Sequence, residues 1–189
     1  MKDIVVIGGP NGAGKTTAAP GLLANYPDIR EFVNADEIAR GISPLNPEGS
    51  AIAAGRLLIE RIHQLARTGA SFAFETTCAG KGHSRLLQSC RAAGYSITLI
   101  FLWLPSAQHA LARVKGRVAR GGHGVADEIV VRRYRTGLRN LLDLYLPLAD
   151  IGLIYDNSTP SRELIAEIAP AANIIHDQTR WASIQKAKQ

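Results

Sequence analysis

One motif in this 189-residue chain indicates its fold: residues 9–17 read Gly9-Pro10-Asn11-Gly12-Ala13-Gly14-Lys15-Thr16-Thr17. It satisfies the pattern GxxxxGK[ST], in which glycines let the backbone wrap around a β-phosphate while main-chain N–H groups point inward. An apolar run over residues 4–7 precedes it, and a helical pattern follows from Lys15. This context predicts a nucleoside triphosphate site; the alternative is a glycine-rich turn that matches by chance.

The polar side chains of this phosphate loop have separate expected roles. Lys15 reaches the β- and γ-phosphates of ATP, and the Thr16 hydroxyl binds Mg²⁺. The helix that follows presents its positive end to the anion. The predicted nucleotide-binding residues of the loop are therefore Gly9, Pro10, Asn11, Gly12, Ala13, Gly14, Lys15, Thr16 and Thr17.

Short apolar runs alternate with helical patterns along the chain, which is typical of a layered α/β fold with a mainly parallel sheet. The five expected strands cover residues 3–8, 31–34, 71–75, 96–103 and 151–156. Helices are expected over 15–25 (with Pro20 as a kink), 48–68, 83–93, 106–120, 127–145 and 162–169. The predicted fold class is a three-layer P-loop NTPase or kinase fold with a five-stranded sheet and a helical, arginine-rich lid.

The bulk composition fits one domain over residues 1–189, with a tail from about residue 171 that has no assigned structure. No apolar run approaches the roughly 20 residues that span a bilayer, and the N-terminal MKDIVVIGG is too short for a signal peptide. We therefore expect a cytoplasmic protein without membrane contact. Cys78 and Cys90 lack metal-site or CxxC spacing, so two buried thiols are preferred to a disulfide.

The positive charge is concentrated in one segment. Eight cations and two anions lie between Arg113 and Arg139, so this segment carries the whole formal net charge of +6. A focused excess fits an anion site better than a basic coat, and it argues against nucleic acid as the partner.

Carboxylates follow two of the expected strands. Asp36 lies just after the strand over 31–34, where ligands gather in open α/β sheets. It is the candidate base that accepts the proton of an attacking hydroxyl; a weak base suffices, because the transition state of phosphoryl transfer is loose. Glu37 is the rival carboxylate, and a helix N-cap or surface position is the alternative for Asp36.

Glu75 ends the strand over 71–75, and a buried acid is costly without a partner. We expect it to face the site, where it holds a Mg²⁺-bound water or bonds the acceptor; a solvent-facing strand end is the alternative. Thr76 and Thr77 add hydroxyl groups nearby. The predicted substrate-binding residues are Asp36, Glu75, Thr76 and Thr77, and the predicted metal residues are Thr16 and Glu75.

Arginines supply positive charge for a migrating phosphoryl group. Arg133 follows Ile129 by four residues and Val130 by three, so it is expected to point inward, whereas Arg132, Arg135 and Arg139 share an outer face. Arg120 and Arg133 are predicted to contact the γ-phosphate, with Arg117 next; surface or structural pairing is the alternative.

Glycines 121, 122 and 124 would let residues 113–139 close as a lid over the nucleotide. His123, between them, is interpreted as structural rather than catalytic. Asn157 follows the last expected strand and is placed near the adenine of ATP.

Six stretches together resemble the zeta-toxin family of kinases: GPNGAGKTT (9–17), FVNADEIARG (32–41), FETTCAG (74–80), RVKGRVARGGHGV (113–125), RRYRTGLRNL (132–141) and YDNS (155–158). The resemblance implies ATP-dependent phosphorylation of a nucleotide sugar, UDP-N-acetylglucosamine in the characterised toxins, and an antitoxin protein as partner. It implies that Asp36 is the base and that Lys15 and Thr16 are the Walker residues. Two arginines of the family, one before GGH and one in RRY, match Arg120 and Arg133. Glu75 matches an acceptor-site position.

The chain departs from the family at Ala126, where the pattern often has proline, and it is shorter than the best-known toxins. Two other functions stay open: a polynucleotide 5′-hydroxyl kinase, and an ATP-binding switch without a second substrate. The sequence offers no aromatic stacking platform for nucleic acid. A switch would have no need of the base Asp36.

Overall fold

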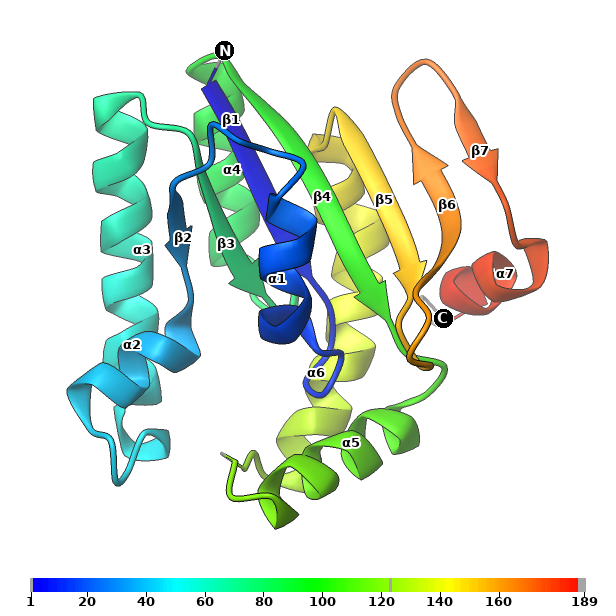
Figure 1. Ribbon diagram of the computed structural model, residues 1–189. Coiled ribbons are helices and arrows are strands. Elements are labelled where there is room, and N and C mark those ends of the chain that lie inside the picture. Colours follow the sequence, from blue (N-terminus) through cyan, green and yellow to red (C-terminus); the bar gives the residue numbers. More distant parts are fainter. Residues whose placement is uncertain (1, 123, 187–189) are drawn as a thin grey trace.

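The computed structural model describes residues 2–122 and 124–186. Five parallel strands form the larger part of one sheet, and Figure 1 shows them side by side. In spatial order they are β2 (Glu31–Val33), β3 (Phe72–Thr76), β1 (Lys2–Gly8), β4 (Tyr95–Trp103) and β5 (Ile151–Asp156). Because all five strands predicted from the sequence occur and run parallel, the predicted α/β fold class is confirmed.

Two further strands extend the sheet beyond β5. These are β6 (Glu163–Ile168) and β7 (Asn173–Ile175), and both pair antiparallel. The helix predicted over residues 162–169 is therefore wrong, and the described residues form a sheet of seven strands rather than five. The apolar residues of this segment suit a strand as well as a helix. In β6, which pairs with β5, Ile165 and Ala166 are completely buried.

Helices cover both faces of the sheet. In the view of Figure 1, α1 lies in front of the sheet, α4 and α6 lie behind it, and α5 crosses below the ends of β1 and β4. The helices are α1 (Lys15–Leu23), α2 (Ala35–Ile42), α3 (Ala51–Thr68), α4 (Gly82–Ala92), α5 (Ala107–Ala119), α6 (Asp127–Asn140) and α7 (Gln178–Lys186). Among these described segments, none is both long and apolar enough to pass through a membrane.

Local sequence explains most of the helix boundaries. The Ser106 side chain caps α5 by accepting a 3.1 Å hydrogen bond from the His109 N–H. Gly69 ends α3 with φ of +70°, a conformation that glycine adopts without a steric penalty. Pro20 lies inside α1, which ends three residues later, at Leu23. Two predicted helices begin or end irregularly: residues 48–50 form a 3₁₀ turn before α3, and residues 141–145 form a π-helical turn after α6.

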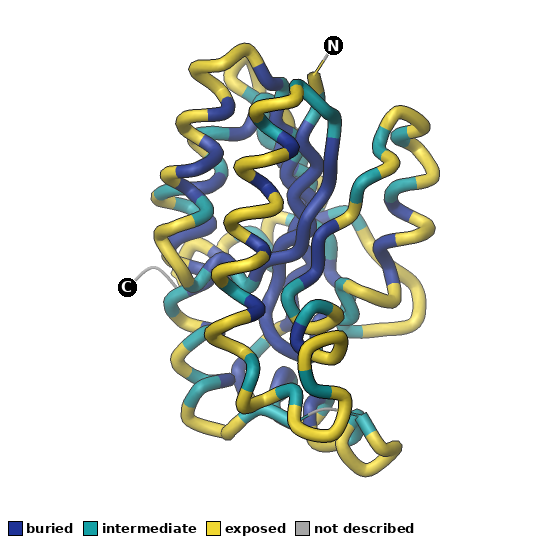
Figure 2. Tube along the Cα trace, turned by 90° about the vertical axis from the view of Figure 1, so that its left-hand side faces the viewer, coloured by how far each residue is buried: buried dark blue, intermediate teal, exposed yellow. Residues whose placement is uncertain are grey.

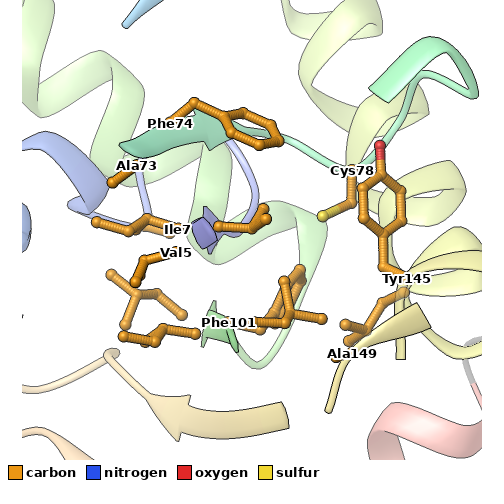
Figure 3. Close-up of a cluster of buried hydrophobic side chains, with 14 of the residues drawn as sticks. Val5, Ile7, Ala73, Phe74, Cys78, Phe101, Tyr145 and Ala149 are labelled. Atoms are coloured by element: carbon orange, nitrogen blue, oxygen red, sulfur yellow. The ribbon is translucent and has the colours of Figure 1, made fainter. Parts of the chain in front are cut away.

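The core is continuous through the central strands, which are buried on both faces as parallel strands usually are. Figure 2 shows these buried strands between helices whose outer sides are exposed. Phe74 and Phe101 lie in one apolar cluster with the Cys78 thiol and the Tyr145 ring (Figure 3). Both cysteines are free and buried, as the sequence predicted.

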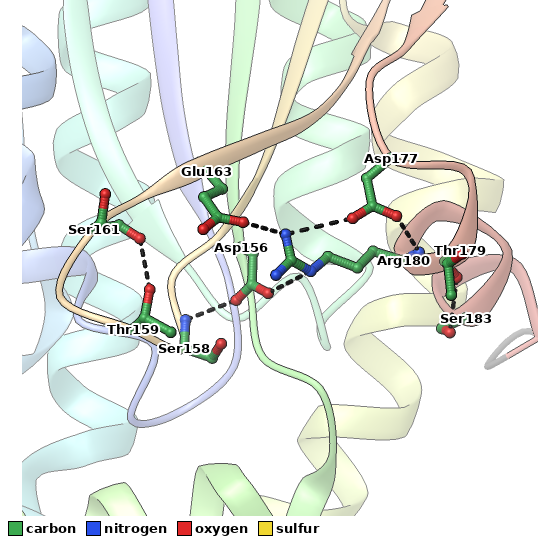
Figure 4. A network of polar contacts seen from close by, with 9 residues as sticks. All are labelled: Asp156, Ser158, Thr159, Ser161, Glu163, Asp177, Thr179, Arg180 and Ser183. Carbon is green, nitrogen blue, oxygen red and sulfur yellow. Dashed lines mark hydrogen bonds and ion pairs between the residues drawn. The ribbon is translucent and has the colours of Figure 1, made fainter.

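An ion-pair network fastens the C-terminal helix to the end of β5 (Figure 4). Arg180 of α7 bonds Asp156 with an Nε–Oδ2 distance of 3.0 Å and also pairs with Glu163 and Asp177. Asp156 is buried, and its Oδ1 accepts a 2.7 Å hydrogen bond from the Ser158 N–H. The network holds in place the turn that follows β5, which carries Asn157.

Candidate active site

The backbone of the phosphate loop has conformations that glycine adopts without steric strain. Gly9, Gly12 and Gly14 have φ values of +148°, +80° and +79°. A Cβ atom at Gly9 would lie 2.5 Å from the Leu102 oxygen, and one at Gly12 would lie 2.9 Å from the Ala110 oxygen. The glycines therefore serve both the turn and the close approach of β4 and α5.

Lys15 begins α1 and turns its ammonium group over the loop. Its Nζ donates hydrogen bonds of 2.9 Å to the Gly9 oxygen and 3.1 Å to the Pro10 oxygen. Burial lowers the pKa of Lys15, while the charges of Glu75 and Asp36 oppose this shift. An anion bound at the loop would also favour the charged ammonium.

Thr16 and Glu75, the two predicted metal residues, are in direct contact. The Thr16 hydroxyl donates a 3.2 Å hydrogen bond to Glu75 Oε2 and accepts one of 3.4 Å from the Asn34 amide. Glu75 is only 8% exposed, and its Oε1 atom is buried with no hydrogen-bond partner within residues 2–122 and 124–186. Burial raises the pKa of this carboxyl, opposed by Lys15 and by the Thr16 bond.

This hydroxyl–carboxylate pair fits Mg²⁺, which prefers oxygen ligands and retains several waters. Within residues 2–122 and 124–186, no cluster of three His, Cys, Asp or Glu side chains could hold a metal alone. A Mg²⁺ ion here would therefore share its coordination with phosphate oxygens and water.

Asp36 lies on the first turn of α2, a helix that the sequence interpretation missed. Asn34 is the N-cap, and its Oδ1 accepts hydrogen bonds from the N–H groups of Asp36 (2.8 Å) and Glu37 (3.4 Å). The Asp36 side chain is exposed and faces a cavity, whereas Glu37 pairs with Arg40 at 2.7 Å. The structure thus separates the predicted base from its rival.

A cavity of about 810 Å³ lies beside the phosphate loop, between α2, α3, the end of β3 and α6. It brings together most of the predicted site residues with side chains that the sequence interpretation did not select. The predicted residues in its wall are Asn11, Lys15, Asp36, Glu75, Thr76, Thr77 and Arg133; others include Asn34, Arg40, Glu48, His83, Arg132 and Thr136.

The three predicted catalytic arginines differ in position. Arg133 faces the cavity; burial lowers its pKa, and the charge of Asp36 opposes that shift. Arg117 has its Nε and Nη2 atoms buried with no hydrogen-bond partner among the described residues, and its charge contributes to the lowered pKa of Lys15. Arg120 is exposed at the end of α5 and is not part of the cavity wall. Arg132, expected on the outer face, is exposed but also lines the cavity.

Asn157 contacts the phosphate loop itself. Its Nδ2 donates a 2.7 Å hydrogen bond to the Ala13 oxygen, and its own main-chain oxygen accepts one of 2.6 Å from Arg113 Nη1. The amide nitrogen therefore fixes the loop in this structure, while the predicted contact with adenine stays a prediction.

The loop after β3 is held by α6 and the π-helical turn that follows it. Asn140 donates to the oxygens of Cys78 (2.8 Å) and Ala79 (3.1 Å), and Tyr145 donates to the Gly80 oxygen (2.8 Å). These contacts position Thr77 and Arg133 on neighbouring walls of the cavity. No sequence pattern pointed to them. His123, interpreted as structural, lies outside the described residues.

This fold and site define the class of the protein: it has the P-loop kinase fold, with the phosphate loop between β1 and α1. The chain belongs to the AAA-domain family, whose model matches residues 4–141. It is 32% identical over 126 residues to an uncharacterized protein of Haemophilus influenzae, and this match covers 67% of the chain and 88% of that protein.

Two solved structures are similar in fold. A chain of the PezAT chromosomal toxin–antitoxin system of Streptococcus pneumoniae matches with a TM-score of 0.68 and 14% identity, over 100% of this chain and 85% of that one. A chain of the AvrRxo1-ORF1:-ORF2 structure with ATP matches with a TM-score of 0.70 and 14% identity, over 100% of this chain and 65% of that one. At such identities the likeness shows the fold alone.

Proposed function

We propose that this chain is an ATP-dependent, zeta toxin-like kinase that transfers the γ-phosphate of ATP to a hydroxyl of a nucleotide sugar, UDP-N-acetylglucosamine or a similar small metabolite. One observation carries the proposal: a single cavity beside the phosphate loop is lined by Lys15, Asp36, Glu75 and Arg133. A cation at the loop and a free carboxylate across the same cavity are the groups that phosphoryl transfer requires.

Each residue has a definite task in this mechanism. Main-chain N–H groups of the phosphate loop, to which Pro10 contributes none, and the Lys15 ammonium bind the triphosphate. Asp36 accepts the proton of the acceptor hydroxyl as the hydroxyl oxygen attacks the γ-phosphorus, and the bond from that phosphorus to the bridging oxygen breaks to release ADP. Thr16 and Glu75 would hold Mg²⁺, which neutralises phosphate charge when it is bound.

Arginines balance the charge that the migrating phosphoryl group spreads over its oxygens. Arg133 already faces the cavity, and Arg117 has two buried nitrogens that lack a partner among the described residues. Arg120 is exposed here, so its proposed contact with the γ-phosphate requires that residues 113–139 close as a lid. Gly121, with φ of +81° just after α5, suits a hinge for that movement.

The similar structures support ATP as the nucleotide and a protein as partner. The AvrRxo1 structure contains ATP, and PezAT is a toxin–antitoxin system. By analogy of fold we include an antitoxin among the proposed partners of this chain.

The cavity favours a small acceptor over the two alternatives. Within the described residues, no phenylalanine, tyrosine or tryptophan lines it, although bases of single-stranded nucleic acid stack on such rings. A polynucleotide 5′-hydroxyl kinase is therefore less well supported. An ATP-dependent switch would leave the placement of Asp36 in the cavity unexplained.

The direct test is transfer of labelled phosphate from ATP to a panel of UDP-sugars, other sugar nucleotides and short RNAs. We expect label on a UDP-sugar, and none with Lys15→Ala, because that variant loses the ammonium over the loop. Lys81→Ala, an exposed lysine before α4, is the matched control and should retain transfer. Label on RNA alone would favour the polynucleotide kinase, and ATP binding without any transfer would favour the switch.

A further inference from the structure

His83 stands in the wall of the cavity with a fixed orientation. It lies in the first turn of α4, and its Nδ1 atom is 3.1 Å from the Thr76 hydroxyl. Its ring also packs against Phe74, with ring centroids 5.4 Å apart. The polar contact with Thr76 and the ring contact with Phe74 together orient the ring, and with it the Nε2 atom.

The hydrogen bonds around Thr76 fit the tautomer in which His83 Nδ1 is an acceptor. Thr76 Oγ1 accepts a 3.0 Å hydrogen bond from the Cys78 N–H. That hydroxyl has one proton to donate, and we assign it to His83 Nδ1 rather than to the Tyr145 hydroxyl, which also contacts Thr76 and itself donates to the Gly80 oxygen. A neutral imidazole with an acceptor at Nδ1 carries its proton on Nε2.

His83 is also expected to be neutral at pH 7. Burial lowers its pKa from the ordinary value near 6.5. Within the described residues, no protein group forms a hydrogen bond with Nε2, although the ring is half-buried and lines the cavity. A ring N–H of a cavity-lining residue that has no hydrogen-bond partner among the described residues is suited to a ligand oxygen.

We propose that His83 is a specificity residue of the acceptor site, and that its Nε2–H donates a hydrogen bond to an oxygen of the hydroxyl-bearing acceptor. This inference rests on the proposed kinase function and adds a residue to it. The acceptor then meets a neutral donor on the β3–α4 wall and the Asp36 carboxylate on the α2 wall of the same cavity. Such a pair matches a polyhydroxyl compound, whose oxygens both donate and accept.

Two substitutions test the roles of the two ring nitrogens of His83 separately. His83→Asn retains a polar group near the Nδ1 position, toward Thr76, but is too short to reach the ligand. His83→Gln places its amide nitrogen near the Nε2 position and retains a donor for the ligand. With ATP and UDP-N-acetylglucosamine as substrates, His83→Asn should raise the KM for the sugar nucleotide about tenfold, as expected for one lost hydrogen bond. His83→Gln should restore most of this loss, and the dissociation constant of ATP should stay within about twofold in both variants.

The tautomer is measured on the full chain without any ligand. In the nitrogen–proton correlation spectrum of protein labelled with ¹⁵N-histidine, the signal lost in His83→Asn should show the Nε2–H tautomer. The Nδ1–H tautomer, or an unchanged KM for the sugar nucleotide in His83→Asn, would overturn the inference.

Failure of the proposed function has a different signature. If the wild-type chain binds ATP but transfers no phosphate to UDP-N-acetylglucosamine, the proposed acceptor is wrong. The tautomer then decides the assignment of His83: Nε2–H supports a donor that faces the cavity, and Nδ1–H removes it.

Discussion

The Asn157 side-chain amide donates a 2.7 Å hydrogen bond to the main-chain oxygen of Ala13, a residue 144 positions earlier in the chain. Ala13 is fully buried within the phosphate loop, so this bond fixes the curvature of the loop from the turn after β5, a strand that lies two positions from β1 in the sheet. Asn157 is itself held by Arg113 and by the turn that follows Asp156. The shape of the loop therefore depends on β5 and α5 as well as on its own glycines.

Asn157→Ala should weaken nucleotide binding by about tenfold, because the loop loses one hydrogen bond that holds it in shape. The loss should be equal for ATP and GTP, measured by titration calorimetry as a ratio to the wild type. Ser158→Ala, at the next position, is the control and should bind as the wild type does. A much larger loss for ATP than for GTP would instead assign Asn157 to the adenine, as the sequence interpretation proposed.

Asp36→Asn should leave ATP affinity unchanged and reduce phosphate transfer by about 10²–10⁴-fold, the usual range for loss of a general base. The amide retains the size of the carboxylate, and the helix cap from Asn34 involves only the Asp36 main chain. Glu37→Gln is the matched control, because it removes only an exposed pair with Arg40. If both variants transfer phosphate at the wild-type rate, the base has to be sought elsewhere, first at Glu75.

The sequence predicted the central sheet well because its signals are local. The five parallel strands are short apolar runs followed by polar turns, and the phosphate loop has a fixed spacing. The segment over 162–169 was misassigned because Leu164, Ile165 and Ile168 fit either a helix or a strand. This segment is a strand because it pairs with β5 and β7, and no local pattern reveals that pairing.

The part of the candidate site that has a local sequence signal could be predicted. Lys15 and Thr16 were selected from the spacing of the phosphate-loop motif, Asp36 and Glu75 from their places at strand ends, and the structure brings them together. Asn34 was missed although Asn34 and Glu37, three residues apart, form a typical N-cap pattern. The contact of His83 with Thr76 depends on the angle between β3 and α4, so sequence alone could not supply it.

Arg117→Gln should raise the stability of the ligand-free protein and weaken ATP binding. The wild-type guanidinium has two buried nitrogens without a partner in the described part of the chain, which is unfavourable until an anion binds. Thermal unfolding with and without MgATP measures both effects: the melting temperature should rise without nucleotide, and the shift caused by nucleotide should shrink. Arg120→Gln, at an exposed position, should leave the ligand-free melting temperature unchanged. An Arg117→Gln protein with a lower melting temperature and normal ATP binding would contradict this.

Glu75→Gln should stabilise the ligand-free protein at pH 7. Burial raises the pKa of Glu75 above its unfolded value, so the folded state holds its proton to higher pH than the unfolded state. The contribution of Glu75 to the free energy of unfolding is therefore greatest below the unfolded pKa and falls as pH rises toward the folded pKa. Glutamine removes this dependence, which unfolding experiments from pH 4 to pH 8 can measure. The variant should also need more Mg²⁺ for transfer; an unchanged requirement would remove Glu75 from the metal site.

Gly137→Ala should destabilise the fold and disturb the acceptor cavity together. A Cβ atom at this position would lie 2.5 Å from the Thr77 main-chain oxygen, so α6 or the loop after β3 has to move. Overpacking of this kind costs about 1–3 kcal/mol, and backbone cannot rotate away as a flexible side chain would.

Gly21→Ala is the control, because a Cβ atom there meets nothing within 4 Å in an exposed part of α1. That variant should gain about 0.4–1 kcal/mol from the lower entropy of its unfolded chain. Denaturant unfolding gives both free energies. Because α6 carries Arg133, Gly137→Ala should also lower phosphate transfer while the Gly21 variant retains it. Equal stability of the two variants would show that α6 is not held against Thr77 in solution.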